Sequence, residues 1–243
     1  MKIYTYYEDI NFKSQNQLID LWKLSWLKQG FQPIVLNINH AKNHPYFEQL
    51  DTEMRKIYHT ITGRQISNYG MSCWFRWLAY ATQNEEKCYV SDYDAINVNF
   101  QPIEPDNQLH LMDSCCPFLA SGKPTQFNNL CHLFVNLTYE RINLIKEQAN
   151  HYHDQEFFMY NFNPKFNESA VQLASKNNIS LTRTRPQIGG FYDPSIPLDP
   201  EHVKVLHVAH RNIQIIKDNN PKYKDIHPDQ LRVDIVKEIL DIK

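Results

Sequence analysis

Glycine is scarce in this chain, with 6 residues in 243. Neither G-x-G-x-x-G nor G-x-x-x-x-G-K-[ST] occurs in the sequence. These glycine-rich loops hold phosphates in dinucleotide-binding and P-loop domains, so we expect neither kind of domain. The sequence also has no run that approaches the roughly 18 apolar residues of a membrane-spanning helix. Residues 1–10 lack the apolar core of a signal peptide, and we expect no transmembrane segment.

Cysteine and basic charge are also limited. The 5 cysteines are an odd number and thinly spread, which favours reduced thiols in a cytoplasmic protein over a disulfide framework. The 25 basic and 27 acidic residues give a net charge of −2. This balance excludes a generally basic nucleic-acid binder, and we expect no nucleic-acid partner. Hydrophobic residues make up 42% of the chain, enough for a sizeable core.

The N-terminal region predicts a strand, a helix and a second strand in succession. Residues 2–7 are rich in Ile, Thr and Tyr, which favours a strand. Ser14 and Gln17 form a capping-box pattern before apolar residues at helical spacing, and Gly30 stands where such a helix would end. Residues 31–38 predict the second strand. This order indicates an α/β domain with a mainly parallel central sheet flanked by helices.

The rest of the chain predicts further elements of both kinds. Helices are expected at 54–58, 73–80, 138–149, 157–159 and 229–242. Strands are expected at 87–91, 96–100, 109–112, 131–135 and 203–208. No internal repeat or long linker interrupts them, which favours a single domain over residues 1–243.

The sequence Asp92-Tyr93-Asp94 follows the predicted strand 87–91 directly. Two carboxylates at this spacing can converge on one hard cation such as Mg²⁺ or Mn²⁺. The carboxyl ends of strands are also where open α/β sheets bind ligands. A solvated turn without a ligand is the alternative. Arg76 lies within the apolar helix 73–80 and needs an anionic partner: this acidic turn, a bound diphosphate or another carboxylate.

Residues 72–80, followed by 88–94, resemble the arginine helix, strand and D-x-D turn of GT-A fold glycosyltransferases, including glycogenin-like and galactosyltransferase-like members. The tight glycine turn often found between helix and strand in that family is missing, since residues 83–86 are Gln-Asn-Glu-Glu. The resemblance implies one GT-A domain. Residues 1–100 would form its nucleotide-binding part, ending in the D-x-D turn, and residues 101–243 its acceptor and catalytic part with a C-terminal helix.

The resemblance also implies a metal site and catalytic residues. Asp92 and Asp94 would bind Mn²⁺ or Mg²⁺, together with His207 at the end of a late strand, and Asp92 would also face the nucleotide-sugar. Asp154 and Gln155 match an Asp-Gln segment at the reacting sugar. Asp154 would act as the base of an inverting reaction, or either residue would support the donor in a retaining one. Capping the following helix is the alternative for Asp154.

Further donor contacts are expected elsewhere in the sequence. Asn136 follows the predicted strand 131–135, and its resemblance to an asparagine of glycogenin-like and galactosyltransferase-like members implies a place near the donor sugar. Aromatic rings and a hydroxyl at the end of the first strand can stack on a base or hydrogen-bond its edge. Gly189 and Gly190 suggest a tight turn or close backbone approach on the acceptor side. The remaining expected donor-binding residues are Thr5, Tyr6, Tyr7, Arg64, Asn68 and Tyr93, with Arg76 and Asp92.

The expected function is metal-dependent transfer of a sugar from a nucleotide-diphosphate sugar, with a UDP-sugar as the expected donor, to a glycan or glycoconjugate hydroxyl. A lipid-linked acceptor would require peripheral docking of this cytoplasmic protein on a membrane. One alternative is a nucleotidyltransferase, although residues 4–16 lack its usual glycine-rich basic loop. A zinc-dependent hydrolase using His202, His207 and His210 is another, and a carbohydrate-binding protein without turnover is the third.

Overall fold

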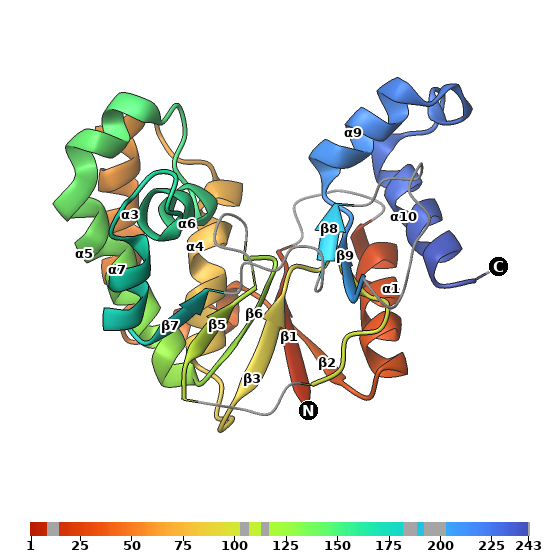
Figure 1. The fold of residues 1–243 in the computed structure, drawn as a ribbon, viewed down its shortest axis with the longest axis horizontal. Coiled ribbons are helices and arrows are strands. Elements are labelled where there is room, and N and C mark those ends of the chain that lie inside the picture. The colour runs from red at the N-terminus through yellow and green to blue at the C-terminus, as the bar shows by residue number, and fades with distance from the viewer. Residues whose placement is uncertain (9–14, 103–106, 113–116, 182–188, 192–202, 243) are drawn as a thin grey trace.

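A six-stranded sheet forms the centre of the protein (Figure 1). The computed structural model describes residues 1–8, 15–102, 107–112, 117–181, 189–191 and 203–242. The strand order is β2-β1-β3-β6-β5-β7, and β6 alone runs antiparallel to its neighbours. The strands are β1 Lys2–Tyr6, β2 Gln32–Leu36, β3 Cys88–Ser91, β5 Leu109–Leu111, β6 Leu119–Gly122 and β7 Ile179–Leu181. The predicted α/β class with a mainly parallel sheet is confirmed.

One face of the sheet is covered by the helices on the left of Figure 1. These are α3 Phe47–Thr62, α4 Asn68–Ala81, α5 Pro124–Gln148, α6 Asp154–Phe162 and α7 Ala170–Lys176. Their apolar side chains form one hydrophobic core, into which helix α2 Ile38–Lys42 also packs and which includes Tyr4 of β1. Ile3, the preceding residue, belongs to a second core. This alternation shows that β1 is buried on both faces, as expected of a parallel strand inside a sheet.

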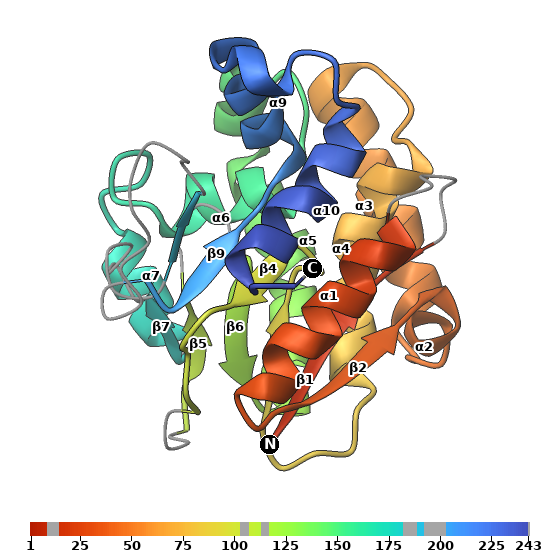
Figure 2. The same cartoon turned by 90° about the vertical axis from the view of Figure 1, so that its right-hand side faces the viewer.

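The second core lies on the opposite face, under α1 Gln15–Lys28 and α10 Pro228–Ile239, which pack side by side (Figure 2). A small sheet with the order β4-β9-β8 adjoins this layer. Its strands are β4 Ala95–Asn97, β8 Gly189–Phe191 and β9 Val205–His207. Helix α9 His210–Asn219 and a short 3₁₀ turn, Pro221–Tyr223, connect β9 to α10. This layer therefore brings late parts of the chain next to β3 and the turn that follows it.

The strand order places a topological switch between β1 and β3. The chain leaves β1 toward β2 on one side and returns through α2, α3 and α4 to β3 on the other side. Crevices at the carboxyl ends of such strand pairs are the usual ligand sites of open α/β sheets. Tyr7 follows β1 at this edge, and Asp92 follows β3.

Most elements expected from the sequence are present, with shifted ends. The strand expected at 31–38 stops at Leu36, because Ile38 begins α2, and the helix expected at 73–80 begins earlier, at Asn68. Ser67 caps that helix by accepting a hydrogen bond from the Gly70 amide. The proposed cap Ser14 lies outside the described residues. Strands β6, β7 and β8 and helices α2, α7 and α9 were not expected from the sequence.

One expectation is wrong, and one of the two alternatives for Gly189 and Gly190 is excluded. The strand expected at 131–135 belongs to α5. The buried residues Phe127, Leu130, Cys131 and Phe134 follow the i, i+3, i+4, i+7 spacing of one helix face, so the apolar run is part of a helical stripe. Asn136 is therefore an exposed helical residue and does not follow a strand. Gly189 and Gly190 form no tight turn, since both pair with β9 as part of β8.

Among the helices that the structure describes, none combines the length and the apolar composition needed to cross a lipid bilayer.

Replacing Gly63 with alanine is expected to destabilise the protein by about 1 kcal/mol. Gly63 ends α3 with a left-handed φ of 70°, and its N–H donates to the His59 carbonyl. An added Cβ would meet nothing within 4 Å, so the cost comes from the backbone conformation alone. Urea unfolding measures the difference. The exposed α3 position Thr52→Ala is the control, expected within about 0.5 kcal/mol of wild type. Equal stability of both variants would contradict the prediction.

Candidate functional site

The acidic turn Asp92–Asp94 is held firmly at the end of β3. The Asp92 amide donates to the Phe118 carbonyl at 2.9 Å, and the Ala95 amide donates to the Asp92 carbonyl at 3.0 Å. Two tryptophans of α1 fix the flanking residues: Trp22 Nε1 donates to Ser91 Oγ at 2.9 Å, and Trp26 Nε1 donates to the Ala95 carbonyl at 3.0 Å. The turn is therefore bonded on both sides before any ligand is considered.

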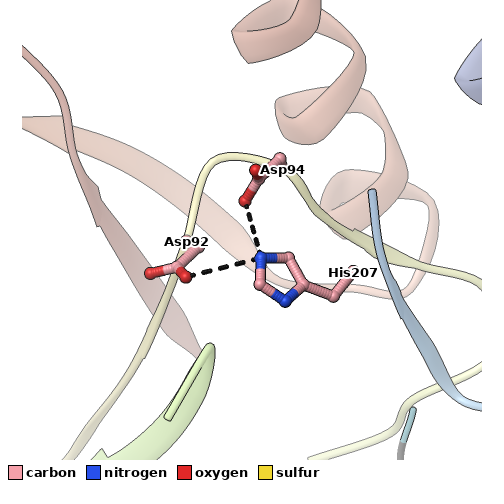
Figure 3. A group of neighbouring side chains, drawn as sticks. All are labelled: Asp92, Asp94 and His207. Carbon is pink, nitrogen blue, oxygen red and sulfur yellow. Dashed lines mark ion pairs between the residues drawn. The ribbon is translucent and has the colours of Figure 1, made fainter. Parts of the chain in front are cut away.

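His207 reaches this turn through pairing between β4 and β9. Ala95 lies opposite His207 in the antiparallel register, and the Val208 amide donates to the Asp94 carbonyl at 2.8 Å. Figure 3 shows the result: His207 Nε2 lies 3.3 Å from Asp94 Oδ1 and 3.7 Å from Asp92 Oδ2. The Phe118 ring stacks on the imidazole with centroids 5.1 Å apart. One ligand atom from each of the three residues lies within 4.8 Å of the others.

Each carboxylate of the turn also binds an arginine with its other oxygen. Asp92 Oδ1 accepts a hydrogen bond from Arg76 Nη1 of α4. Asp94 Oδ2 accepts one from Arg232 Nη2 of α10 at 2.5 Å. The outer oxygens are thereby used by guanidinium groups, and the inner oxygens face His207. This division orients both carboxylates toward one point.

Arg76 binds a second carboxylate, that of Asp154. Arg76 Nε and Nη2 lie 2.8 Å and 2.6 Å from Asp154 Oδ2, and Trp77 Nε1 donates to the same oxygen at 2.8 Å. Asp154 is the first residue of α6 and is only 3% exposed; the N-cap is His153. The expectation that Arg76 needs an anionic partner is confirmed, and the partners are Asp92 and Asp154. Helix capping, the alternative role for Asp154, is not what the structure shows.

Burial and neighbouring charges make the two carboxylates of the turn unequal. Burial raises the pKa of Asp92, although Arg76 and His207 act in the opposite direction. Burial also acts to raise the pKa of Asp94, but His207 and Arg232 outweigh it and lower that pKa to about 2. Burial lowers the pKa of Arg76, whereas Asp154 and Asp92 together raise it well above its ordinary value. Asp94 is consequently the carboxylate whose charged form the site stabilises more.

The inner atoms of Asp92, Asp94 and His207 fit a divalent cation. Two carboxylate oxygens and an imidazole nitrogen suit Mg²⁺ or Mn²⁺. Neighbouring ligands at right angles around Mg²⁺ stand about 3 Å apart, close to the 3.3 Å and 3.7 Å between His207 and the carboxylates. Three protein ligands would leave three positions of an octahedron for other oxygens. Within the described part of the chain, this is the group of His, Cys, Asp and Glu side chains close enough to share an ion.

Some of the expected donor-binding residues lie beside this cluster. The rings of Tyr7 and Tyr93 meet edge to face with centroids 5.7 Å apart, at the carboxyl ends of β1 and β3. Gln15 Nε2 of α1 donates to the Tyr93 hydroxyl at 2.9 Å. Thr5 is fully buried, and Tyr6 packs into the core and donates to Glu8. The aromatic edge therefore consists of Tyr7 and Tyr93.

Other expected residues lie elsewhere. Gln155 of α6, Asn136 of α5, Asn68 at the start of α4 and Arg64 before it are all exposed. In the described structure none of these four side chains is hydrogen-bonded or ion-paired to the cluster.

Of the histidines expected to form a zinc cluster, the described His207 and His210 do not belong to one group of possible metal ligands. His210 begins α9, its side chain is 59% exposed, and it lies 3.5 Å from Asp229. His202 lies outside the described residues, and His207 faces the two carboxylates of the turn instead.

The structure adds three site residues that the sequence reasoning missed: Trp77, Phe118 and Arg232. Trp77 and Phe118 carried no signal, because aromatic residues are common in this chain and most build the core. Arg232 carried a weak one: its immediate neighbours Leu231 and Val233 are apolar, but Gln230 and Asp234 next to them are polar. Arg76, by contrast, stands inside the apolar helix 73–80.

Comparisons with known proteins give a partial family match and several matches among solved structures. Residues 1–88 match the model of a family described as a domain of unknown function, DUF8765, and no curated protein matches the chain. Among solved structures, the glycosyltransferase GlyE of Streptococcus pneumoniae TIGR4 aligns over 98% of this chain and 64% of its own, with 14% identity and a TM-score of 0.46. Its apo form has the same coverage and identity and a TM-score of 0.39. This chain thus spans less than two thirds of that structure, and similarity at this level assigns neither fold family nor activity.

Replacing Arg76 with methionine is expected to cost about 3–5 kcal/mol of unfolding free energy, because Asp92 and Asp154 would lose their shared cation in a largely buried place. Arg55→Met is the matched control. Arg55 is exposed and pairs with Asp51 one turn earlier in α3, so its loss should cost at most about 1 kcal/mol. Urea unfolding followed by tryptophan fluorescence measures both variants. Equal losses would show that Arg76 contributes no more than a surface ion pair.

Proposed function

We propose that this protein is a metal-dependent glycosyltransferase that moves a sugar from a nucleotide-diphosphate sugar, with a UDP-sugar as the expected donor, to a hydroxyl of a glycan or glycoconjugate. The observation that carries the proposal is the convergence of Asp92, Asp94 and His207 at the end of β3. The topological switch beside it is the usual place for a ligand in such sheets. The resemblance of residues 72–80 and 88–94 to the arginine helix and D-x-D block supports the choice of class.

The three metal-ligating side chains suggest how the negative charge of a diphosphate leaving group would be neutralised. Asp92 Oδ2, Asp94 Oδ1 and His207 Nε2 would hold Mn²⁺ or Mg²⁺. When bound, the ion supplies Lewis-acid neutralisation of the charge that develops on the diphosphate. Arg76 and Arg232 occupy the outer carboxylate oxygens and keep the inner ones turned toward the site. These residues therefore set the geometry before a donor arrives.

The aromatic edge next to the cluster suggests where the nucleoside would lie. Tyr7 and Tyr93 present rings at the carboxyl ends of β1 and β3, and aromatic rings can stack on a nucleobase. Gln15 holds the Tyr93 hydroxyl, so α1 fixes the orientation of one of these rings. A base on this edge would leave the diphosphate near Asp92 and Asp94.

The geometry around Asp154 favours a positioning role. Its Oδ2 accepts N–H donors from Arg76 and Trp77, and the residue is almost fully buried. A general base must lie within hydrogen-bond reach of the acceptor hydroxyl, whereas this oxygen already has its partners. Holding Arg76 against Asp92 is the role that these contacts support. Proton abstraction by Asp154 stays a prediction, and so does donor support by the exposed Gln155.

Thermal unfolding with UDP, GDP, CDP and their sugars, each with and without Mn²⁺, tests the proposed class. We expect the melting temperature to rise only when one nucleotide and Mn²⁺ are both present. A ligand at about 100 times its Kd adds about 2.7 kcal/mol of stability. Asp94→Asn keeps the shape of the side chain but removes its charge, and should abolish this shift; Asp51→Asn on the surface of α3 should keep it. A shift with Zn²⁺ alone, and none with any nucleotide, would favour the hydrolase.

Asp154→Asn separates the two roles of that residue. Binding of nucleotide and Mn²⁺ should survive in this variant, because Asp154 does not face the inner ligand atoms. Turnover is followed as release of nucleoside diphosphate from the donor that the thermal-unfolding experiment selects. It should fall by about 10²–10⁴-fold if Asp154 is the base. A positioning role predicts a fall of about tenfold. Asp51→Asn, in the surface ion pair of α3, is the matched control and should keep wild-type turnover. Unchanged turnover in Asp154→Asn would exclude both roles.

A further inference from the structure

We propose that Arg232 of α10 is a positioning residue of the metal site, which holds Asp94 with its inner oxygen toward His207 and ties the strand that carries His207 to the acidic turn. The proposal rests on the proposed function only in placing a divalent cation at Asp92, Asp94 and His207. Helix α10 would then contribute a residue to the metal site, whose carboxylate ligands follow β3.

The contacts of Arg232 reach both halves of the site. The residue is 3% exposed. Its Nη2 donates to Asp94 Oδ2 at 2.5 Å, and its Nε donates to the carbonyl of Val208 at 3.0 Å. Val208 follows His207 directly, and its amide donates to the Asp94 carbonyl at 2.8 Å. The Arg232 guanidinium therefore binds the side chain of Asp94 and the backbone next to His207.

The position requires a guanidinium rather than a simple positive charge. Its two bonds leave from different nitrogens of a planar, fixed fork, a geometry that a lysine ammonium cannot reproduce. The Tyr93 ring lies 5.8 Å from the guanidinium carbon, and Gln15 of α1 holds the Tyr93 hydroxyl. Arg232 is thus confined by the acidic turn, by β9 and by an aromatic ring that α1 fixes.

Charge alone predicts the opposite effect on metal affinity. A buried cation next to a divalent-cation site repels the incoming ion, so an arginine that only neutralised Asp94 would weaken metal binding, and its removal would strengthen it. An arginine that holds Asp94 in the binding orientation strengthens metal binding, and its removal weakens it. The sign of the change in Mn²⁺ affinity therefore distinguishes these two roles.

Mn²⁺ binding to the full chain, measured from the electron paramagnetic resonance signal of free Mn²⁺, is the test. Arg232→Met is expected to weaken binding by about 10–100-fold, the usual effect of losing a group that orients a metal ligand. Arg232→Lys keeps the charge and loses the fork, and should also weaken binding, by about tenfold. Arg55→Met on the surface is the matched control and should bind like wild type. Unchanged or tighter binding by a folded Arg232→Met or Arg232→Lys protein would overturn the proposal.

A second measurement needs no variant at position 232. Hydrogen exchange of the α10 amides in the wild-type chain should slow on addition of Mn²⁺, whereas the amides of α3 should not change. Equal exchange in α10 with and without bound Mn²⁺ would count against the proposal.

The failure of this proposal and of the proposed function can be told apart. If Asp94→Asn and His207→Ala lose Mn²⁺ binding but the Arg232 variants keep it, the metal site stands and the role of Arg232 is wrong. If wild type binds no Mn²⁺ at all, both are wrong.

Discussion

A buried guanidinium must be paired with carboxylates, because an isolated buried charge costs several kcal/mol, and this requirement organises the structure on both sides of the sheet. Arg76 comes from α4 on one face and Arg232 from α10 on the other. Both reach the same turn of three residues, Asp92–Asp94. The two helical layers are therefore connected through charges at one edge, while their hydrophobic cores remain separate. The turn is the point at which the three layers are bonded together.

The same contacts determine which carboxylate oxygens face the proposed metal site. Each carboxylate uses one oxygen for an arginine and turns the other toward His207. A surface D-x-D turn would have neither constraint, since water would bind all four oxygens. Here each carboxylate uses one oxygen for the stabilising ion pair with an arginine, and its other oxygen is the ligand atom that faces His207. Stability and ligand geometry are consequently linked at Asp92 and Asp94, and neither can be altered alone.

The sequence allowed the acidic turn, the helix with Arg76 and the strand with His207 to be predicted, because each has a local signal: charge in an apolar context or β-branched runs. It did not show which carboxylates pair with which arginine, since Asp154 lies 78 residues from Arg76. The run at 131–135, apolar except for His132, fits a strand or one side of a helix equally well, and only the spacing from Phe127 onward decides for α5. Arg232 had a weaker signal than Arg76, because polar residues flank its two apolar neighbours, and nothing local pointed to Asp94 as its partner.

The bond between Arg232 and Asp94 joins residues 138 positions apart, and such distant contacts form only after the entropy of a long loop has been lost. Helices and the β1-α1-β2 unit can form from contacts close in sequence. The inner oxygen of Asp94 takes its place only when α10 has docked and β9 has paired with β4. A collapsed chain with the first hydrophobic core in place but α10 undocked would lack this arrangement. The complete ligand arrangement of the acidic turn therefore requires contacts between residues far apart in the sequence, and the chain can become compact before this arrangement forms.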